Sequence, residues 1–239
     1  MFYNKPECIK LADQIYIFKD AVPKEMCDRY AEILDSYTKE DYIEDNNAID
    51  WYGDKMSPST PELLDLWETV SEIIYPDFYI NPQSKVIASR PGQDGMFIHT
   101  DSPGRDKAHE LTQIDSYSTC SLISYGVIAY LSDFDGGEVF YPAFNPNGTL
   151  KSKDSDFNGE LEYKPEKGDV VIHGAEYPCL HGTRPVTSGI RYAYSCFATH
   201  LNDLPGTFYP YKSPEYLEKV KDRSLESYQN WLTPIERKI

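Results

Sequence analysis

A run of eight short strand-like segments between residues 84 and 200 most constrains the fold of this chain. Their hydrophobic pattern has the period of a β-strand, and Pro-Gly, Asp-Gly-Gly and Lys-Gly-Asp turn sequences separate them. The predicted strands are 84–90, 96–101, 119–132, 137–141, 161–164, 169–173, 179–186 and 190–200. So many short strands in succession predict a mainly β fold (α+β), namely a double-stranded β-helix, or jelly roll.

The residues before these strands have a largely helical pattern. Residues 14–18 alternate as one opening strand, and apolar residues then recur at helical spacing over 23–37. The segment 59–62 (STPE) is typical of a capping box, and it predicts a second helix that ends at Pro76. We predict that these N-terminal helices pack on one sheet of the jelly roll.

The chain of 239 residues shows no repeat, linker or low-complexity segment. We therefore predict a single domain over 1–239. It would contain a helical lead-in at about 1–80, a jelly-roll core at about 84–200 and a helical tail at about 213–232.

The composition argues against some classes of partner. The net charge is −16, and such a negative field repels phosphate backbones, so no nucleic-acid partner is expected. The five cysteines are odd in number and show no Cys-x-x-Cys spacing, which fits reduced thiols. No apolar signal core and no 18-residue apolar run are present, so we expect a cytoplasmic protein without a membrane partner. No pattern indicates an oligomeric state.

Two short motifs supply the chemistry of a metal site. His99 and Asp101 form a His-x-Asp motif in the predicted strand 96–101, where side chains two residues apart share one face. His181 lies in the predicted strand 179–186. Two imidazoles and one carboxylate can hold one face of a non-haem Fe(II) ion and leave the other face open. Alone, the His-x-Asp motif also fits a surface strand with two solvated polar groups.

Several further blocks lie in order around these motifs. They are 90–93, 97–101, 129–133, 136–140, 163–171 and 181–192. Together they resemble the Fe(II)- and 2-oxoglutarate-dependent dioxygenases of the prolyl 4-hydroxylase type. The resemblance runs from about residue 85 to residue 200, and the strand and helix at 14–37 are similar to that family's N-terminal lead-in.

The resemblance implies a catalytic set and a co-substrate pocket. The implied iron ligands are His99, Asp101 and His181. Arg191 would complete the catalytic set by binding the distal carboxylate of 2-oxoglutarate. A guanidinium suits that role because it meets a carboxylate in a bidentate pair and stays charged when buried. Further candidates for cofactor binding are Tyr130, which matches a family tyrosine, Arg90 and Thr183.

Three positions depart from the family pattern. Arg90 stands where a tyrosine is common, and Phe197 stands where a tryptophan is common. His173 stands on the strand before His181, where the family usually has an apolar residue. We interpret His173 as a residue that lines the pocket or supports a ligand, and not as a metal ligand.

The resemblance also implies an activity similar to that of procollagen-proline 4-dioxygenase. The substrate would be a prolyl residue in a peptide or protein, hydroxylated at an unactivated C–H bond while 2-oxoglutarate is converted to succinate and CO2. The implied cofactors are Fe(II), 2-oxoglutarate, O2 and L-ascorbate. The polar segments 102–117 and 143–160 are expected to be loops that border the pocket and carry substrate choice.

Three alternatives remain open. The chain could hydroxylate a free amino acid or another small molecule. It could also be a jelly-roll binding module without catalysis. A nucleobase dealkylase shares the iron triad, but by resemblance it would carry a second downstream arginine at a spacing that is absent here.

Overall fold

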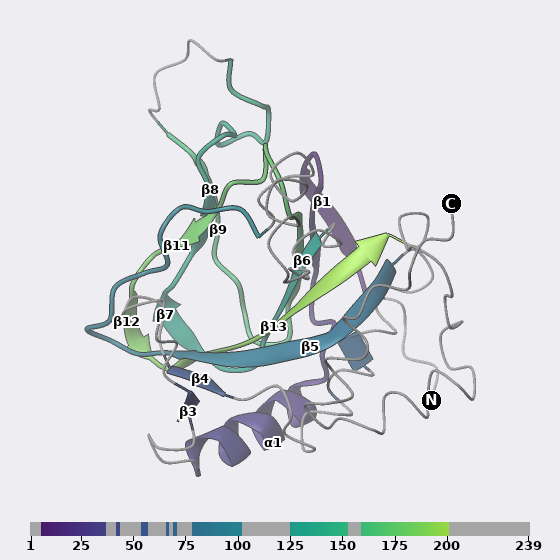
Figure 1. Cartoon of the computed structure of the whole chain (residues 1–239). Coiled ribbons are helices and arrows are strands. Elements are labelled where there is room, and N and C mark those ends of the chain that lie inside the picture. The colour runs from purple at the N-terminus through teal and green to yellow at the C-terminus, as the bar shows by residue number, and fades with distance from the viewer. Residues whose placement is uncertain are drawn as a thin grey trace, which may run out of the picture.

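The largest element of the fold is an eight-stranded antiparallel sheet. It is seen in a computed structural model that describes residues 6–36, 42–43, 54–56, 66, 69–70, 78–101, 125–152 and 159–200 (Figure 1). The strand order is β1–β2–β10–β6–β13–β5–β4–β3. The bounds are β1 Cys8–Ala12, β2 Ile15–Phe18, β10 Val170–Gly174, β6 Tyr125–Tyr130, β13 Arg191–His200, β5 Phe78–Ser89, β4 Asp54–Met56 and β3 Tyr42–Ile43. Figure 1 shows the long strands β5 and β13 side by side.

Two smaller antiparallel sheets complete the β structure. One has the order β11 (Gly182–Thr183), β8 (Val139–Tyr141) and β9 (Leu161–Tyr163). The other pairs β12 (Val186–Gly189) with β7 (Phe134–Gly136). The mainly β, jelly-roll fold that the strand pattern predicts is therefore confirmed.

Side-chain alternation gives the large sheet two different buried faces. In β13, Tyr192 and Tyr194 belong to the main hydrophobic cluster, while Arg191 and Ala193 line a cavity on the other side. Successive residues of a strand point to opposite faces, so one strand serves both. The same alternation holds in the neighbouring strands, whose residues in the main cluster are Val86 and Ala88, Val127 and Ala129, and Val170 and Ile172.

Helix α1 (Lys24–Asp35) covers the face opposite the cavity. Its buried residues Cys27, Tyr30 and Leu34 recur at helical spacing and belong to the main hydrophobic cluster with β5, β6 and β13. Pro23 is the N-cap residue, one position before the start of the helical pattern's first turn, where a proline is tolerated. No helix among the described residues is long and apolar enough to span a membrane.

The predicted second helix lies mostly outside the described residues. Of that segment, residues 66 and 69–70 have helical backbone, and Leu66 and Val70 are fully buried in the main cluster. The backbone N–H of Leu66 donates to the hydroxyl of Tyr30 at 3.2 Å. The predicted tail at 213–232 and the loop 102–117 also lie outside the described residues.

The prediction of a strand over 96–101 is wrong. This segment follows a turn in which Gly92 has φ +88°, and it forms no continuous ladder. It is held by single contacts instead: the N–H of Thr183 donates to the carbonyl of Met96 at 3.0 Å, and His99 forms an isolated bridge with His181. His99 is therefore placed by these contacts and not by strand pleating.

The turn before β10 is fixed by a buried carboxylate. Asp169 is 1% exposed and accepts hydrogen bonds from Lys19 Nζ at 2.9 Å and from the Tyr163 hydroxyl at 2.6 Å. It also accepts from the backbone N–H groups of Glu166 at 3.0 Å and Asp20 at 3.2 Å. These bonds join β2, β9 and the start of β10, which leads toward the cavity.

We expect Asp169→Ala to lower the free energy of unfolding by about 3 kcal/mol, since it leaves partly buried donors without their acceptor. Urea unfolding followed by circular dichroism measures this change. Asp135→Ala is the matched control, because the ion pair of Asp135 with Lys164 is exposed and contributes at most about 1 kcal/mol. Equal losses in the two variants would show that the Asp169 network does not stabilise the fold.

Candidate metal centre

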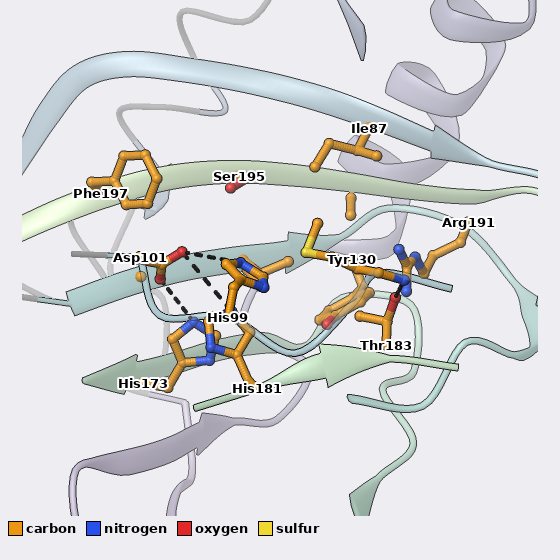
Figure 2. Close-up of a pocket in the computed structure, with 14 residues that line it drawn as sticks. Ile87, His99, Asp101, Tyr130, His173, His181, Thr183, Arg191, Ser195 and Phe197 are labelled. Carbon is orange, nitrogen blue, oxygen red and sulfur yellow. Dashed lines mark hydrogen bonds and ion pairs between the residues drawn. The ribbon is translucent and has the colours of Figure 1, made fainter. Parts of the chain in front are cut away.

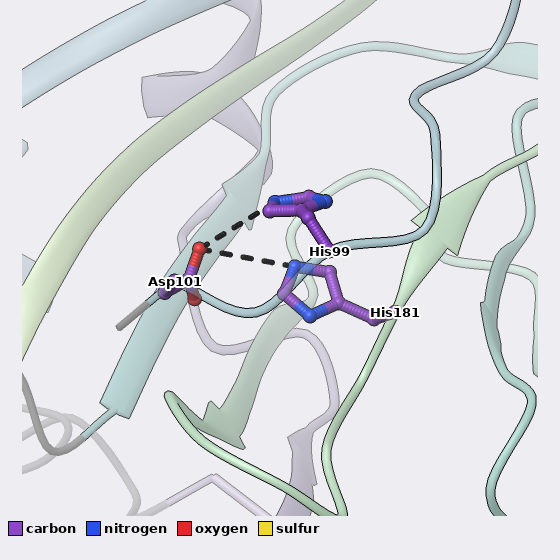
Figure 3. Close-up of side chains that lie close together, drawn as sticks. All are labelled: His99, Asp101 and His181. Atoms are coloured by element: carbon purple, nitrogen blue, oxygen red, sulfur yellow. Dashed lines mark ion pairs between the residues drawn. The ribbon is translucent and has the colours of Figure 1, made fainter. Parts of the chain in front are cut away.

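His99, Asp101 and His181 lie close together (Figure 3), and all three line the cavity. Each offers one ligand atom, and these atoms all lie within 4.8 Å of one another. Asp101 Oδ1 is 3.7 Å from His99 Nε2 and 3.9 Å from His181 Nε2. The structure thus brings together the three predicted ligands, from segments far apart in the sequence.

Backbone hydrogen bonds fix the spacing of the two histidines. The N–H of His99 donates to the carbonyl of His181 at 2.9 Å, and the N–H of His181 donates to the carbonyl of His99 at 3.0 Å. Directly paired residues of an antiparallel bridge carry neighbouring side chains, and the two ring centroids are 4.4 Å apart. One reciprocal bridge therefore sets the distance between two candidate ligands.

Each imidazole ring is oriented by a hydrogen bond to the backbone carbonyl two residues before it. His99 Nδ1 is 2.9 Å from the carbonyl oxygen of Phe97, and His181 Nδ1 is 3.0 Å from the carbonyl oxygen of Cys179. A carbonyl can only accept, so each Nδ1 carries the proton and donates it. Nε2 of each ring then keeps its lone pair, which a metal ligand needs, and this atom faces Asp101.

Burial and neighbouring groups set the charge of the ligands. Burial lowers the pKa of His181 to about 3, with a further contribution from the nearby His173. Burial alone would raise the pKa of Asp101, but the hydrogen bond from His173 and the neighbouring His99 and His181 hold it well below its usual range. A neutral imidazole and an ionised carboxylate are the forms that bind a divalent metal.

A buried cation lies in the same cavity. Arg191 is 3% exposed, and its Nη2 donates to Ser89 Oγ at 2.9 Å and its Nη1 to the carbonyl of Gly137 at 3.3 Å. Its Nε–H is buried without a hydrogen-bond partner, and no ion pair joins Arg191 to any carboxylate among the described residues. A buried charge without a counter-ion is costly, so the site fits an anionic ligand. Burial lowers the pKa of Arg191.

The cavity runs between the cation and the candidate metal ligands. Figure 2 shows Arg191, Tyr130 and Thr183 at one end and His99, Asp101, His173 and His181 at the other. The rest of the cavity lining is mostly apolar and includes Ile87, Met96, Ile128, Ala193 and Phe197. Apolar walls exclude water and strengthen electrostatic interactions inside the cavity.

The other predicted co-substrate residues divide into two groups. Tyr130 and Thr183 line the cavity; burial raises the pKa of Tyr130 to about 12, so its hydroxyl keeps its proton. Thr183 Oγ1 accepts the N–H of Met96 at 3.0 Å. Arg90 is half-buried just beyond β5 and is not among the residues that line the cavity, so the structure does not bring it to the predicted position.

Two contacts were not predicted from the sequence. Ser89 holds the Arg191 guanidinium because the two residues are directly paired between β5 and β13. Asp101 contacts His173, which was predicted only as a lining or supporting residue. Of the predicted loop 143–160, the described residues lie outside the cavity lining, and Phe144 is buried in a separate cluster.

Comparison with protein-family models gave no match, and comparison with curated protein sequences gave none either. Solved structures do match. One is a prolyl hydroxylase from Trichoplax adhaerens in complex with a hypoxia-inducible-factor oxygen degradation domain peptide, with TM-score 0.55 and 13% identity over 80% of this chain and 85% of that one.

Another is the 2-oxoglutarate complex of the viral collagen prolyl hydroxylase of Paramecium Bursaria Chlorella virus-1. It has TM-score 0.50 and 14% identity over 80% of this chain and 99% of that one. Identities this low show the fold alone. The resemblance read from the sequence motifs is thereby confirmed at the level of the fold: the chain has the jelly-roll architecture of these two prolyl hydroxylases.

Proposed function

We propose that the protein is an Fe(II)- and 2-oxoglutarate-dependent dioxygenase that hydroxylates an unactivated C–H bond. The observation that carries the proposal is the buried, uncompensated guanidinium of Arg191 in the same cavity as His99, Asp101 and His181. A metal triad alone suits many reactions. A triad that shares an apolar cavity with a buried cation suits a co-substrate that chelates metal at one end and carries a carboxylate at the other.

Each residue would have a distinct task in this cavity. His99, Asp101 and His181 would hold Fe(II), which when bound supplies the activation of O2. Arg191 would bind the distal carboxylate of 2-oxoglutarate in a charge-assisted pair, and the Tyr130 hydroxyl would donate a hydrogen bond to the same carboxylate. The apolar walls would keep water from the reacting atoms. L-Ascorbate would keep the iron reduced between turnovers.

For the substrate we propose a prolyl residue in a peptide or protein. The support is the shared fold and the peptide that the Trichoplax adhaerens neighbour binds. The net charge of −16 suits a neutral or cationic peptide and opposes a phosphate backbone. A prolyl 4-hydroxylase-like reaction would consume 2-oxoglutarate and O2 and give succinate, CO2 and the hydroxylated residue.

The test supplies the protein with Fe(II), 2-oxoglutarate, ascorbate and O2, together with either a library of proline-containing peptides or free amino acids. We expect mass spectrometry to show one added oxygen on a peptide, and succinate formation that depends on both iron and 2-oxoglutarate. If oxygen is added to a free amino acid and to no peptide, the substrate is a small molecule and not a peptide. No succinate under any of these conditions would overturn the proposal in favour of a binding module.

A further inference from the structure

His173 is a fully buried histidine of the cavity to which the proposed reaction assigns no task. It lies on β10 at 0% exposure and lines the cavity beside the candidate ligands (Figure 2). Its Nε2 is 3.2 Å from Asp101 Oδ2, and its Nδ1 is 3.0 Å from the hydroxyl of Tyr141 on β8. Both ring nitrogens are therefore committed to hydrogen bonds with named partners.

The carboxylate of Asp101 fixes the direction of the first bond, and the tautomer that results sets the second. The carboxylate of Asp101 can only accept, so Nε2 of His173 carries a proton and donates it. In the neutral imidazole Nδ1 is then the acceptor, and the Tyr141 hydroxyl donates to it. Tyr141 is itself 0% exposed, so the order Tyr141–His173–Asp101 is a continuous buried chain of hydrogen bonds.

The chain distinguishes the two oxygens of Asp101. Oδ2 is held by His173, whereas Oδ1 faces the Nε2 atoms of His99 and His181 at 3.7 and 3.9 Å. Asp101 would therefore offer one oxygen to a metal ion and not two. A carboxylate held in this way cannot swing to chelate the ion with both oxygens, so the remaining coordination positions stay open.

Gly126 provides independent support for the importance of this contact. It is directly paired with His173 across β6 and β10. A Cβ atom at this position would lie 2.3 Å from Asp101 Oδ2 and 2.5 Å from His173 Nε2. Only glycine at this position leaves room for the Asp101 carboxylate and the His173 imidazole to contact each other on this face of the sheet.

We propose that His173, supported by Tyr141, is a positioning residue that orients Asp101 for monodentate metal binding. The inference rests on the proposed function, because it requires a metal ion at His99, Asp101 and His181. Residues that hold metal ligands through hydrogen bonds typically contribute 10- to 100-fold to metal affinity. His173 would contribute within this range and would remain outside the coordination sphere.

The test measures the Mn(II) and Co(II) dissociation constants of the wild-type chain and of variants. We expect His173→Leu to weaken binding by about 10- to 100-fold. His173→Gln should lose less, because its amide N–H can still donate to Asp101. Adding Tyr141→Phe to His173→Leu should cost no further affinity, because Tyr141 acts through the imidazole that is already gone.

Co(II) absorption spectra separate a positioning role from a ligand role. We expect the bands of Co(II)-loaded His173→Gln to match those of the wild-type chain, since the ligand set is unchanged. A lower coordination number would make His173 a ligand and overturn the inference, whereas a higher number would show that Asp101 chelates with both oxygens once His173 no longer holds it, which supports the inference. Unfolding of the metal-free variants, measured in parallel, identifies any loss that is due to the fold.

The outcomes also separate this inference from the proposed function. Equal affinity in the wild-type chain and His173→Leu would overturn the positioning role alone. If the loss of metal affinity is fully explained by a smaller fraction of folded protein, the positioning role is overturned as well. A wild-type chain that binds neither ion would overturn both the metal centre and this inference.

Discussion

Asp101→Ala is expected to abolish iron-dependent turnover and to weaken metal binding by more than about 100-fold. Supporting residues of a metal site typically contribute 10- to 100-fold, and removal of one of three ligands should exceed that range. The remaining ligands, His99 and His181, would lack the carboxylate charge that offsets part of the charge of the ion. Isothermal titration of Mn(II) and succinate formation measure the two losses.

The fold should survive this substitution, because His99 and His181 are placed by backbone hydrogen bonds and not by Asp101. Circular dichroism of the metal-free variant checks that expectation, and His181→Ala should give the same loss of turnover. Asp28→Ala is the matched control, since Asp28 is exposed on α1 and pairs with Lys167 at 2.9 Å. Full activity in the Asp101 variant would remove the central claim about the metal centre.

Arg191→Met is expected to weaken 2-oxoglutarate binding by about 100-fold or more. The substitution keeps an apolar stem of similar length and removes the guanidinium, so the distal carboxylate would be buried without a partner. Hydrogen bonds to charged groups contribute about 1.5–3 kcal/mol each, and two of them correspond to at least about 3 kcal/mol. Each 1.4 kcal/mol is about tenfold in affinity. Titration of 2-oxoglutarate into the Mn(II)-loaded protein measures the change.

Pyruvate provides an internal control, because it has the chelating 2-oxo acid and lacks the distal carboxylate. Its affinity should change little in Arg191→Met, and metal affinity should be the same as in the wild-type chain. Arg29→Met is the matched surface variant, since Arg29 is exposed on α1, which covers the opposite face of the sheet. If 2-oxoglutarate binds Arg191→Met and the wild-type chain equally, Arg191 does not bind the co-substrate.

Much of the fold could be predicted because long strands with two buried faces have a strong local pattern. The predicted strand 190–200 and β13 agree closely, and so do 169–173 and β10. The pairing of β7 with β12 was not predicted, and neither was β11 as a separate strand, which has only two residues. Such short elements exist because tertiary contacts hold them, and their own residue pattern carries little information.

The residues of the candidate site could be predicted more fully than the contacts that hold them. Metal ligands and a carboxylate-binding arginine must be particular residue types, so sequence motifs point to His99, Asp101 and Arg191. The contacts of Ser89 and His173 depend on strand register, which pairs Ser89 with Arg191 and His173 with Gly126. Register is set by the whole sheet, and a one-residue shift would exchange its faces.

The bridge between His99 and His181 would also determine when, during folding, the candidate site could first bind a metal ion. Its two halves are far apart in the chain, and closing so long a loop costs conformational entropy before any contact repays it. The large sheet is equally non-local, because β10 lies between β2 and β6 while β5 pairs with β13. Folds dominated by distant pairings form slowly, so a partly folded chain would present isolated histidines and not a ligand set. An ion that binds this site would therefore select the finished fold and stabilise it by mass action, in proportion to the logarithm of its free concentration once the site is largely filled.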